Sequence, residues 1–465
     1  MQEPLVELEA TQFTEEGAVM SWKLSLWRGF AILLAIVGGV AGLDRMAGPT
    51  AAQDYEAAGP VYEYSPAAAA SSGLLAESLP AELAEDIAGA GYSGLGPMPV
   101  SQVRLLMDGL GLAGPLEDHG IRTFGWVEGG YTYASGGSVP LSVQPRQNRF
   151  GNEFLVNQIG LVLQKQLKQD EFDIGWNVRY FAGHDAALGQ PGGGIDDPVT
   201  NERFSHDFRD LYVSAHLPIL TEGGMNVKVG RMNTIIGYNG FLAPYRPLYS
   251  SDYQFFYSQD GAFTGFLTQL VVNDRLEIWN GMSLGANTFF EKRSEDSYCY
   301  IGQINYWLTD EQRTRLTASL HLGRDAIFAA PGRGGDFDTI VELRVQHAWN
   351  ENVTQIVQSN MGWADDTPVG TGAWYGLYTI GVIRMTCTLD LILRAEWFDD
   401  VGGTRTGFDT NYGELTLGFN WHPNKYLEIR PEVRGDFAED PVFGDANNPQ
   451  DESQFTTAVS ALIKF

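Results

Sequence analysis

Cysteine is scarce in this chain, which has two, Cys299 and Cys387, in 465 residues. Two cysteines cannot build a disulfide framework, and we place them at opposite rims of the predicted fold, so no bridge is expected. Histidines are also few and show no pair at metal-ligand spacing. No serine lies in a nucleophile elbow and no cysteine has a histidine nearby in sequence. We therefore predict no catalytic residue, no metal and no cofactor.

Basic residues are outnumbered, with 30 Lys and Arg against 58 Asp and Glu, for a net charge of -28. Nucleic acid and anionic lipid head groups both need a basic patch, so this balance argues against either partner. The excess negative charge is expected in solvated loops.

Long apolar runs are missing except for one, from Gly29 to Leu43, which follows Lys23 and Arg28. The run is shorter than the ~20 residues of a membrane-spanning helix. Small residues follow it, so residues 1–52 are predicted to be a signal peptide region, with Met20 as an alternative start and an uncleaved anchor as the other interpretation. Residues 53–120 are rich in Ala, Pro, Gly and Glu, with weakly helical pieces at Leu79–Ile87 and Gln102–Leu110, and are predicted to be a largely unstructured periplasmic segment.

The C-terminal part of the chain alternates apolar and polar residues. In Leu427–Phe437 the apolar residues fall on one face, and the other face carries Glu428, Arg430, Glu432, Arg434 and Asp436. Five charges on one face of a strand cannot line a packed apolar core, but they suit a polar lumen with a lipid-facing outer wall. The last stretch, Ser453–Phe465, has the same period and is predicted to pair with the first strand, which removes the sheet edges.

Sixteen such strands are predicted, and the even number is typical of bacterial barrels. They lie near Thr123–Tyr133, Phe154–Gln164, Phe172–Phe181, Phe208–His216, Met225–Met232, Ala262–Val271, Leu276–Met282, Cys299–Trp307, Thr314–Gly323, Phe337–Trp349, Val353–Trp363, Trp374–Thr386, Leu389–Phe398, Asn411–His422, Leu427–Phe437 and Ser453–Phe465. Short and long connections alternate, which is how an outer-membrane barrel is built. The predicted fold is therefore all-β, a single transmembrane antiparallel β-barrel over residues 121–465.

The alternation predicts which charged side chains line the pore. These are Glu128, Asp173, Arg179, Asp210, Lys228, Arg315, Glu342, Arg344, Arg394, Glu396, Glu414, Glu428, Arg430, Glu432, Arg434 and Asp436. Nine are acidic and seven are basic, so the wall is nearly balanced. Because the loops carry most of the negative charge, weak cation selectivity is expected.

The connection 233–261 has many aromatic residues. An apolar loop must bury itself, either in the barrel mouth or against a neighbouring barrel. By analogy with sixteen-stranded porins we favour the mouth, and we predict a constriction loop that contains Tyr245, Arg246, Tyr249, Asp252 and Tyr253. The alternative is an outer cap of packed aromatic rings that does not affect permeation.

Four stretches resemble the OmpL-like putative β-barrel porin family. They are GWVEGGYTY at Gly125–Tyr133, NRFGNEF and NQIGLVLQK within Asn148–Lys165, VKVGRMNTIIGY at Val227–Tyr238, and LGFNWHPNKYLEIRPEVRGDF at Leu417–Phe437. The resemblance covers Ile121 to Phe465 and implies an outer-membrane, porin-like barrel. It implies no functional residues.

We expect a porin with a water-filled channel for passive diffusion of small hydrophilic solutes and ions, because sixteen strands enclose a lumen wide enough for water. The alternatives are an outer-membrane barrel hydrolase and a structural barrel without an open pore. The expected partners are outer-membrane lipid, the barrel-insertion machinery, small hydrophilic solutes and a second copy of the chain.

Overall fold

The structure is a computed structural model that describes residues 109–111, 113–134, 149–189, 203–292, 297–308, 312–324, 337–445 and 448–465. The predicted signal peptide region, the helical piece Leu79–Ile87 and most of Gln102–Leu110 lie outside these residues. The described residues belong to one compact unit, Val61–Phe465.

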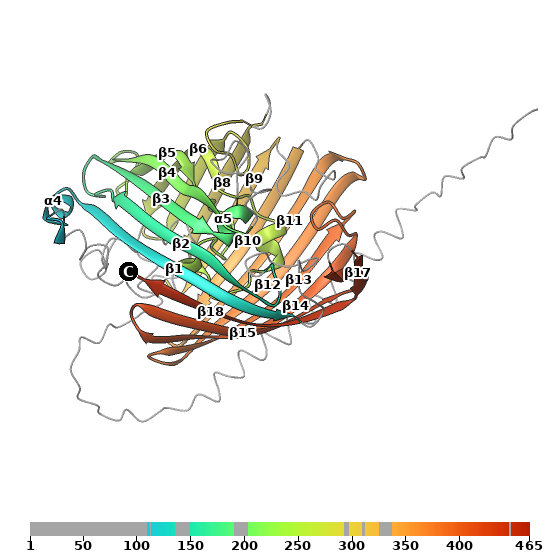
Figure 1. The fold of residues 1–465 in the computed structure, drawn as a ribbon. Helices are drawn as coiled ribbons and strands as arrows, with labels where there is room; N and C mark the ends of the chain where they lie inside the picture. The colour runs from blue at the N-terminus through green and yellow to red at the C-terminus, as the bar shows by residue number, and fades with distance from the viewer. Residues whose placement is uncertain are drawn as a thin grey trace, which may run out of the picture. The chain divides into compact units, whose positions relative to one another are not determined.

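The fold is a closed antiparallel barrel of sixteen strands in the order β1-β18-β15-β14-β13-β12-β11-β10-β9-β8-β7-β6-β5-β4-β3-β2 (Figure 1). The strands are β1 Ile121–Ala134, β2 Glu153–Lys165, β3 Asp173–Gly183, β4 Ser205–Leu217, β5 Met225–Met232, β6 Phe263–Asn273, β7 Leu276–Ser283, β8 Cys299–Trp307, β9 Thr314–Gly323, β10 Phe337–Ala348, β11 Val353–Thr367, β12 Gly370–Thr386, β13 Leu389–Val401, β14 Thr410–Asn424, β15 Leu427–Ala438 and β18 Ser453–Lys464. The predicted sixteen-stranded barrel is confirmed.

A few short elements lie outside the barrel wall. They are α4 Ala113–Asp118, α5 His184–Leu188, η3 Ala243–Tyr245, α6 Tyr253–Tyr257 and the small hairpin of β16 Phe443–Asp445 and β17 Asn448–Asp451. The sequence pattern did not predict them. It also ended β11 too early and began β12 too late, because these strands continue into a tight hairpin in which Thr367 pairs with Gly370.

The barrel closes between its first and last strands, which lie side by side in Figure 1. β1 and β18 pair antiparallel from Trp126 opposite Lys464 to Ala134 opposite Thr456. The terminal residue extends this pairing, because the Phe465 amide donates to the Gly125 carbonyl at 2.8 Å and the Gly125 amide donates back at 2.6 Å. The predicted position of Phe465 beside the strand that contains Trp126 is correct.

Side chains alternate between a buried inner face and an exposed outer face along most wall strands, whereas β5, β6 and β12 alternate less regularly. In β15 the five charged residues from Glu428 to Asp436 are almost fully buried, whereas the outward Val433 and Phe437 are 40% and 52% exposed. An exposed apolar outer face around a polar interior is the arrangement of a barrel in lipid.

The two cysteines are both free, with Cys299 buried at the start of β8 and Cys387 exposed in the turn between β12 and β13. The expectation that they form no bridge is confirmed. Among the described residues, no helix is long and apolar enough to cross a membrane.

Candidate functional site

The connection between β5 and β6, residues 233–261, folds into the barrel; we call it the inner loop. Its backbone amides donate to wall side chains on distant strands. Gly237 donates to Glu342 of β10 at 2.9 Å and Tyr238 to Gln358 of β11 at 2.9 Å. Further along, Tyr249 donates to Glu432 of β15 at 3.0 Å. Because these acceptors face the interior, the inner loop crosses the lumen.

Burial of its aromatic rings explains why the inner loop takes this path. Tyr249 and Tyr253 have no exposed surface, and Tyr253 stacks on Phe398 and Tyr412 of the wall, with ring centroids 6.1 and 5.0 Å apart. The wall leaves room for this packing, since a Cβ at Gly130 of β1 would lie 2.6 Å from the Tyr249 ring. The rings are buried within the same chain and are therefore not available to a second barrel.

Arg246 anchors the inner loop through an ion-pair network. Its guanidinium pairs with Glu128 of β1 and, at 3.1 Å, with Asp185 of α5. Arg430 of β15 also pairs with Glu128, at 2.5 Å, and donates to the Arg246 carbonyl at 2.9 Å. Two guanidinium groups thus meet at the Glu128 carboxylate, and their attraction opposes the cost of burying these charges.

A second cationic contact holds the middle of the inner loop. Arg394 of β13 donates to the Ser250 carbonyl at 2.8 Å and pairs with Glu414 of β14 at 2.9 Å. Arg434 of β15 donates to the Ser251 carbonyl at 2.6 Å. The wall therefore supplies donors to the loop carbonyls as well as acceptors to its amides, so both kinds of buried backbone group find partners on the wall.

Two acidic groups in the segments inside the barrel have perturbed pKa values. Burial raises the pKa of Asp252 above its usual range, although Arg394 and a hydrogen bond from Asn239 act in the opposite direction. Burial also raises the pKa of Asp185, against the opposing effect of Arg246. Both groups hold protons more tightly here than they would in water.

Thirteen of the sixteen predicted pore-lining residues are buried, and Asp173, Lys228 and Arg315 are half-buried. The buried ones include all of those that the inner loop contacts. Lys228 lies over the rings of Tyr212 and Trp279, at 5.2 and 5.7 Å, and Arg315 lies 6.0 Å from the Trp307 ring. These two cations belong to β5 and β9. Both strands are separated by several others from β13 and β15, which carry Glu396 and Glu432.

Sequence analysis missed several residues of the site. Asp185 lies in a short helix that periodicity did not indicate, and it accepts from Asn157 and Gln158 of β2 at 3.0 and 2.7 Å. Arg405, from the β13–β14 connection, donates to the Tyr257 carbonyl at 2.7 Å and lies 4.3 Å from the Trp374 ring. The sequence around a single charged residue in a loop does not indicate which distant residue it will contact.

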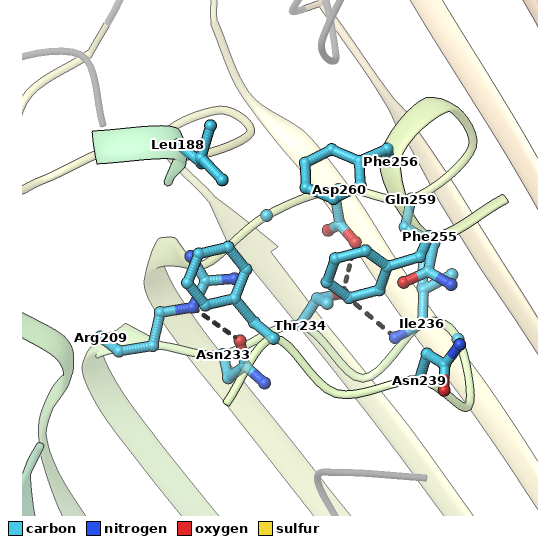
Figure 2. A pocket seen from close by; sticks show the side chains of 13 residues that line it. Leu188, Arg209, Asn233, Thr234, Ile236, Asn239, Phe255, Phe256, Gln259 and Asp260 are labelled. Carbon is cyan, nitrogen blue, oxygen red and sulfur yellow. Dashed lines mark hydrogen bonds between the residues drawn. The ribbon is translucent and has the colours of Figure 1, made fainter. Parts of the chain in front are cut away.

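A pocket opens where the start and end of the inner loop meet β4 and α5 (Figure 2). Figure 2 shows Arg209 and Asn233 on one side and Phe255 and Gln259 on the other. The cavity measures about 30 Å³, counted as the space open to the centres of water-sized molecules. It therefore has room for a small group rather than for a whole sugar ring.

The family model described as putative beta-barrel porin-2, OmpL-like, matches residues 120–465. Among solved structures, the fold is similar to an anion-selective porin from Comamonas acidovorans, with 12% identity, 74% of this chain and 99% of that chain covered, and a TM-score of 0.52.

The fold is also similar to OmpF of Salmonella typhi in complex with daunomycin, with 13% identity, coverage of 75% and 99%, and a TM-score of 0.52. OprB of Pseudomonas putida gives 11% identity, coverage of 77% and 97%, and a TM-score of 0.51. No curated protein matches the sequence. Identities this low show a shared fold only.

Proposed function

The chain belongs to the putative beta-barrel porin-2, OmpL-like, family. For a channel of this family we propose that the inner loop sets the size and the lining of the passage. The protein is an outer-membrane β-barrel porin. The proposal concerns how the channel admits small hydrophilic solutes and ions. It rests on one observation, which is that the inner loop crosses a polar lumen and buries most of its charged wall.

We place the solute passage along the wall of β5 to β9. The inner loop contacts β1 to β4 and β10 to β15, and it touches β8 and β9 only near its ends, through Gln303 and His321. Lys228 and Arg315, which keep solvent exposure, lie on β5 and β9. A narrow polar passage of this kind favours small hydrophilic solutes over bulky ones.

Membership in a porin family favours a channel over an enzyme. The fold does bring a thiol, an imidazole and a carboxylate together, because Cys299 interacts with His321, whose Nδ1 lies 3.2 Å from Asp260. All three residues have at most 2% exposed surface. Without access for a substrate, this cluster fits an anchor that fixes the end of the inner loop to β9, and the hydrolase alternative gains no support from it.

Excising Gly240 to Phe256 with a short glycine bridge tests the proposal. The excision removes Arg246, Tyr249 and Tyr253 from the lumen and lets water reach the wall charges. Single-channel conductance in planar bilayers should then increase, and larger neutral solutes should pass in liposome swelling. Unchanged conductance in a correctly inserted barrel would mean that the inner loop does not limit the passage.

A further inference from the structure

We propose that the pocket of Figure 2 is a binding subsite for a carboxylate group, with Arg209 as its main donor. The proposal rests on the proposed function in one respect, because it assigns a preferred class of solute, small organic carboxylates, to the same lumen.

The terminal nitrogens of Arg209 are the donors that a carboxylate would contact. Its Nε donates to the Asn233 side-chain oxygen at 3.0 Å, and the guanidinium carbon lies 4.0 Å from the centre of the Phe241 ring. Its two terminal nitrogens have no acceptor among the described residues, although the side chain is only 3% exposed and lines the pocket. A buried guanidinium fork fixed at Nε and stacked on a ring presents two parallel N–H groups, which match a planar carboxylate.

The neighbouring acidic groups already have partners. Asp210 pairs with Arg179 at 2.7 Å, and Asp207 pairs with Arg231 at 3.0 Å. Asp260 accepts from Thr234 through one oxygen and contacts His321 through the other. Arg209 is therefore the cation of this cluster with no carboxylate at ion-pair distance in the described part of the chain. These three carboxylates still act on it electrostatically from farther away.

The rest of the pocket agrees with a carboxylate ligand. The Gln259 Nε2 atom is buried and has no acceptor among the described residues, so it offers another donor. Phe241 and Phe255 stack with centroids 6.3 Å apart and give the pocket an apolar side. The small cavity admits the carboxylate and leaves the remainder of the solute toward the opening.

Binding of acetate to the purified full-length barrel in detergent, measured by ligand-observed NMR, tests the proposal. Acetamide has the same shape without the charge, and inorganic phosphate is a competing anion. A ligand this small should bind with a dissociation constant of roughly 1 mM. We expect acetate to bind at least about tenfold more tightly than acetamide, since charge-assisted hydrogen bonds carry the contact.

Arg209→Gln should weaken acetate binding roughly ten- to hundredfold, because it removes the charge and the fork. Arg275→Gln, in the turn between β6 and β7, is the matched control and should bind as the wild type does. Gln259→Met removes a donor that has no acceptor among the described residues, and it should weaken binding a few-fold even if Arg209→Gln fails to fold.

Three results would overturn the proposal: equal affinity for acetate and acetamide, stronger binding of phosphate than of acetate, or unchanged acetate affinity in both pocket variants. The measurement needs no bilayer. A barrel that binds acetate but shows no conductance would refute the proposed channel and leave the subsite standing. A barrel that conducts but does not bind acetate would refute the subsite and leave the proposed channel standing.

Discussion

Glu432 provides the sharpest test of how the inner loop is held. Its carboxylate accepts from the Tyr249 amide at 3.0 Å and the Ser250 amide at 3.1 Å, and only 4% of the residue is exposed. Hydrogen bonds to a charged group contribute about 1.5–3 kcal/mol each. If water replaces about half of this stabilisation once the loop leaves the wall, Glu432→Ala should weaken loop docking by roughly 1.5–3 kcal/mol.

A loss of this size changes the ratio of docked to undocked loop by roughly 10- to 150-fold. Single-channel recordings of Glu432→Ala should therefore show new high-conductance intervals and more current noise than the wild type. Glu432→Gln keeps one acceptor oxygen but no charge, so its effect should be intermediate.

Asp390→Ala serves as the control, because Asp390 is an inward carboxylate of β13 that lies 3.3 Å from His422 and has no contact to the inner loop. It should leave the conductance pattern unchanged. If Glu432→Ala inserts normally and conducts with the same steps and noise as the wild type, the contacts of Glu432 do not hold the loop, and the calculation above is wrong.

Three further predictions concern assembly, pH and selectivity. Deleting Phe465 removes the backbone pair with Gly125 and the terminal ring, so it should lower the amount of barrel in the outer membrane; normal levels would contradict this. Because burial raises the pKa of Asp252, docking of the inner loop is strongest below the usual carboxyl pKa and weakens as pH rises through the raised value. Conductance should therefore fall as the pH is lowered through the raised pKa of Asp252, and an increase over that interval would mean that this carboxyl does not govern loop docking. In a salt gradient the reversal potential should show weak cation preference, stronger at low salt, because the acidic loops act on every ion at the mouth whereas the Arg209 subsite acts only on a bound carboxylate; anion preference would be inconsistent with an acidic mouth.

The barrel could be predicted from the sequence because its signal is local and repeated. Each strand places apolar and polar residues on alternate faces, and a one-residue error in facing would expose every charge of a strand such as Leu427–Phe437 to lipid. The ends of most predicted strands lie within about three residues of the observed ones. The inward position of the wall charges followed from the same alternation.

The partners of those charges could not be predicted, because they depend on where the inner loop lies. Arg246 reaches Glu128 across 118 positions of the chain, and Arg430 reaches the same carboxylate across 302. The balance of acidic and basic residues in the sequence suggested a solvated wall on which side chains of both charges are exposed. In the structure most of these side chains are buried in ion pairs. The unpaired fork of Arg209 likewise exists only because its neighbouring carboxylates bind other cations. Local periodicity fixes which face a side chain occupies, but the pairing of buried charges depends on contacts between segments that only the closed barrel brings together.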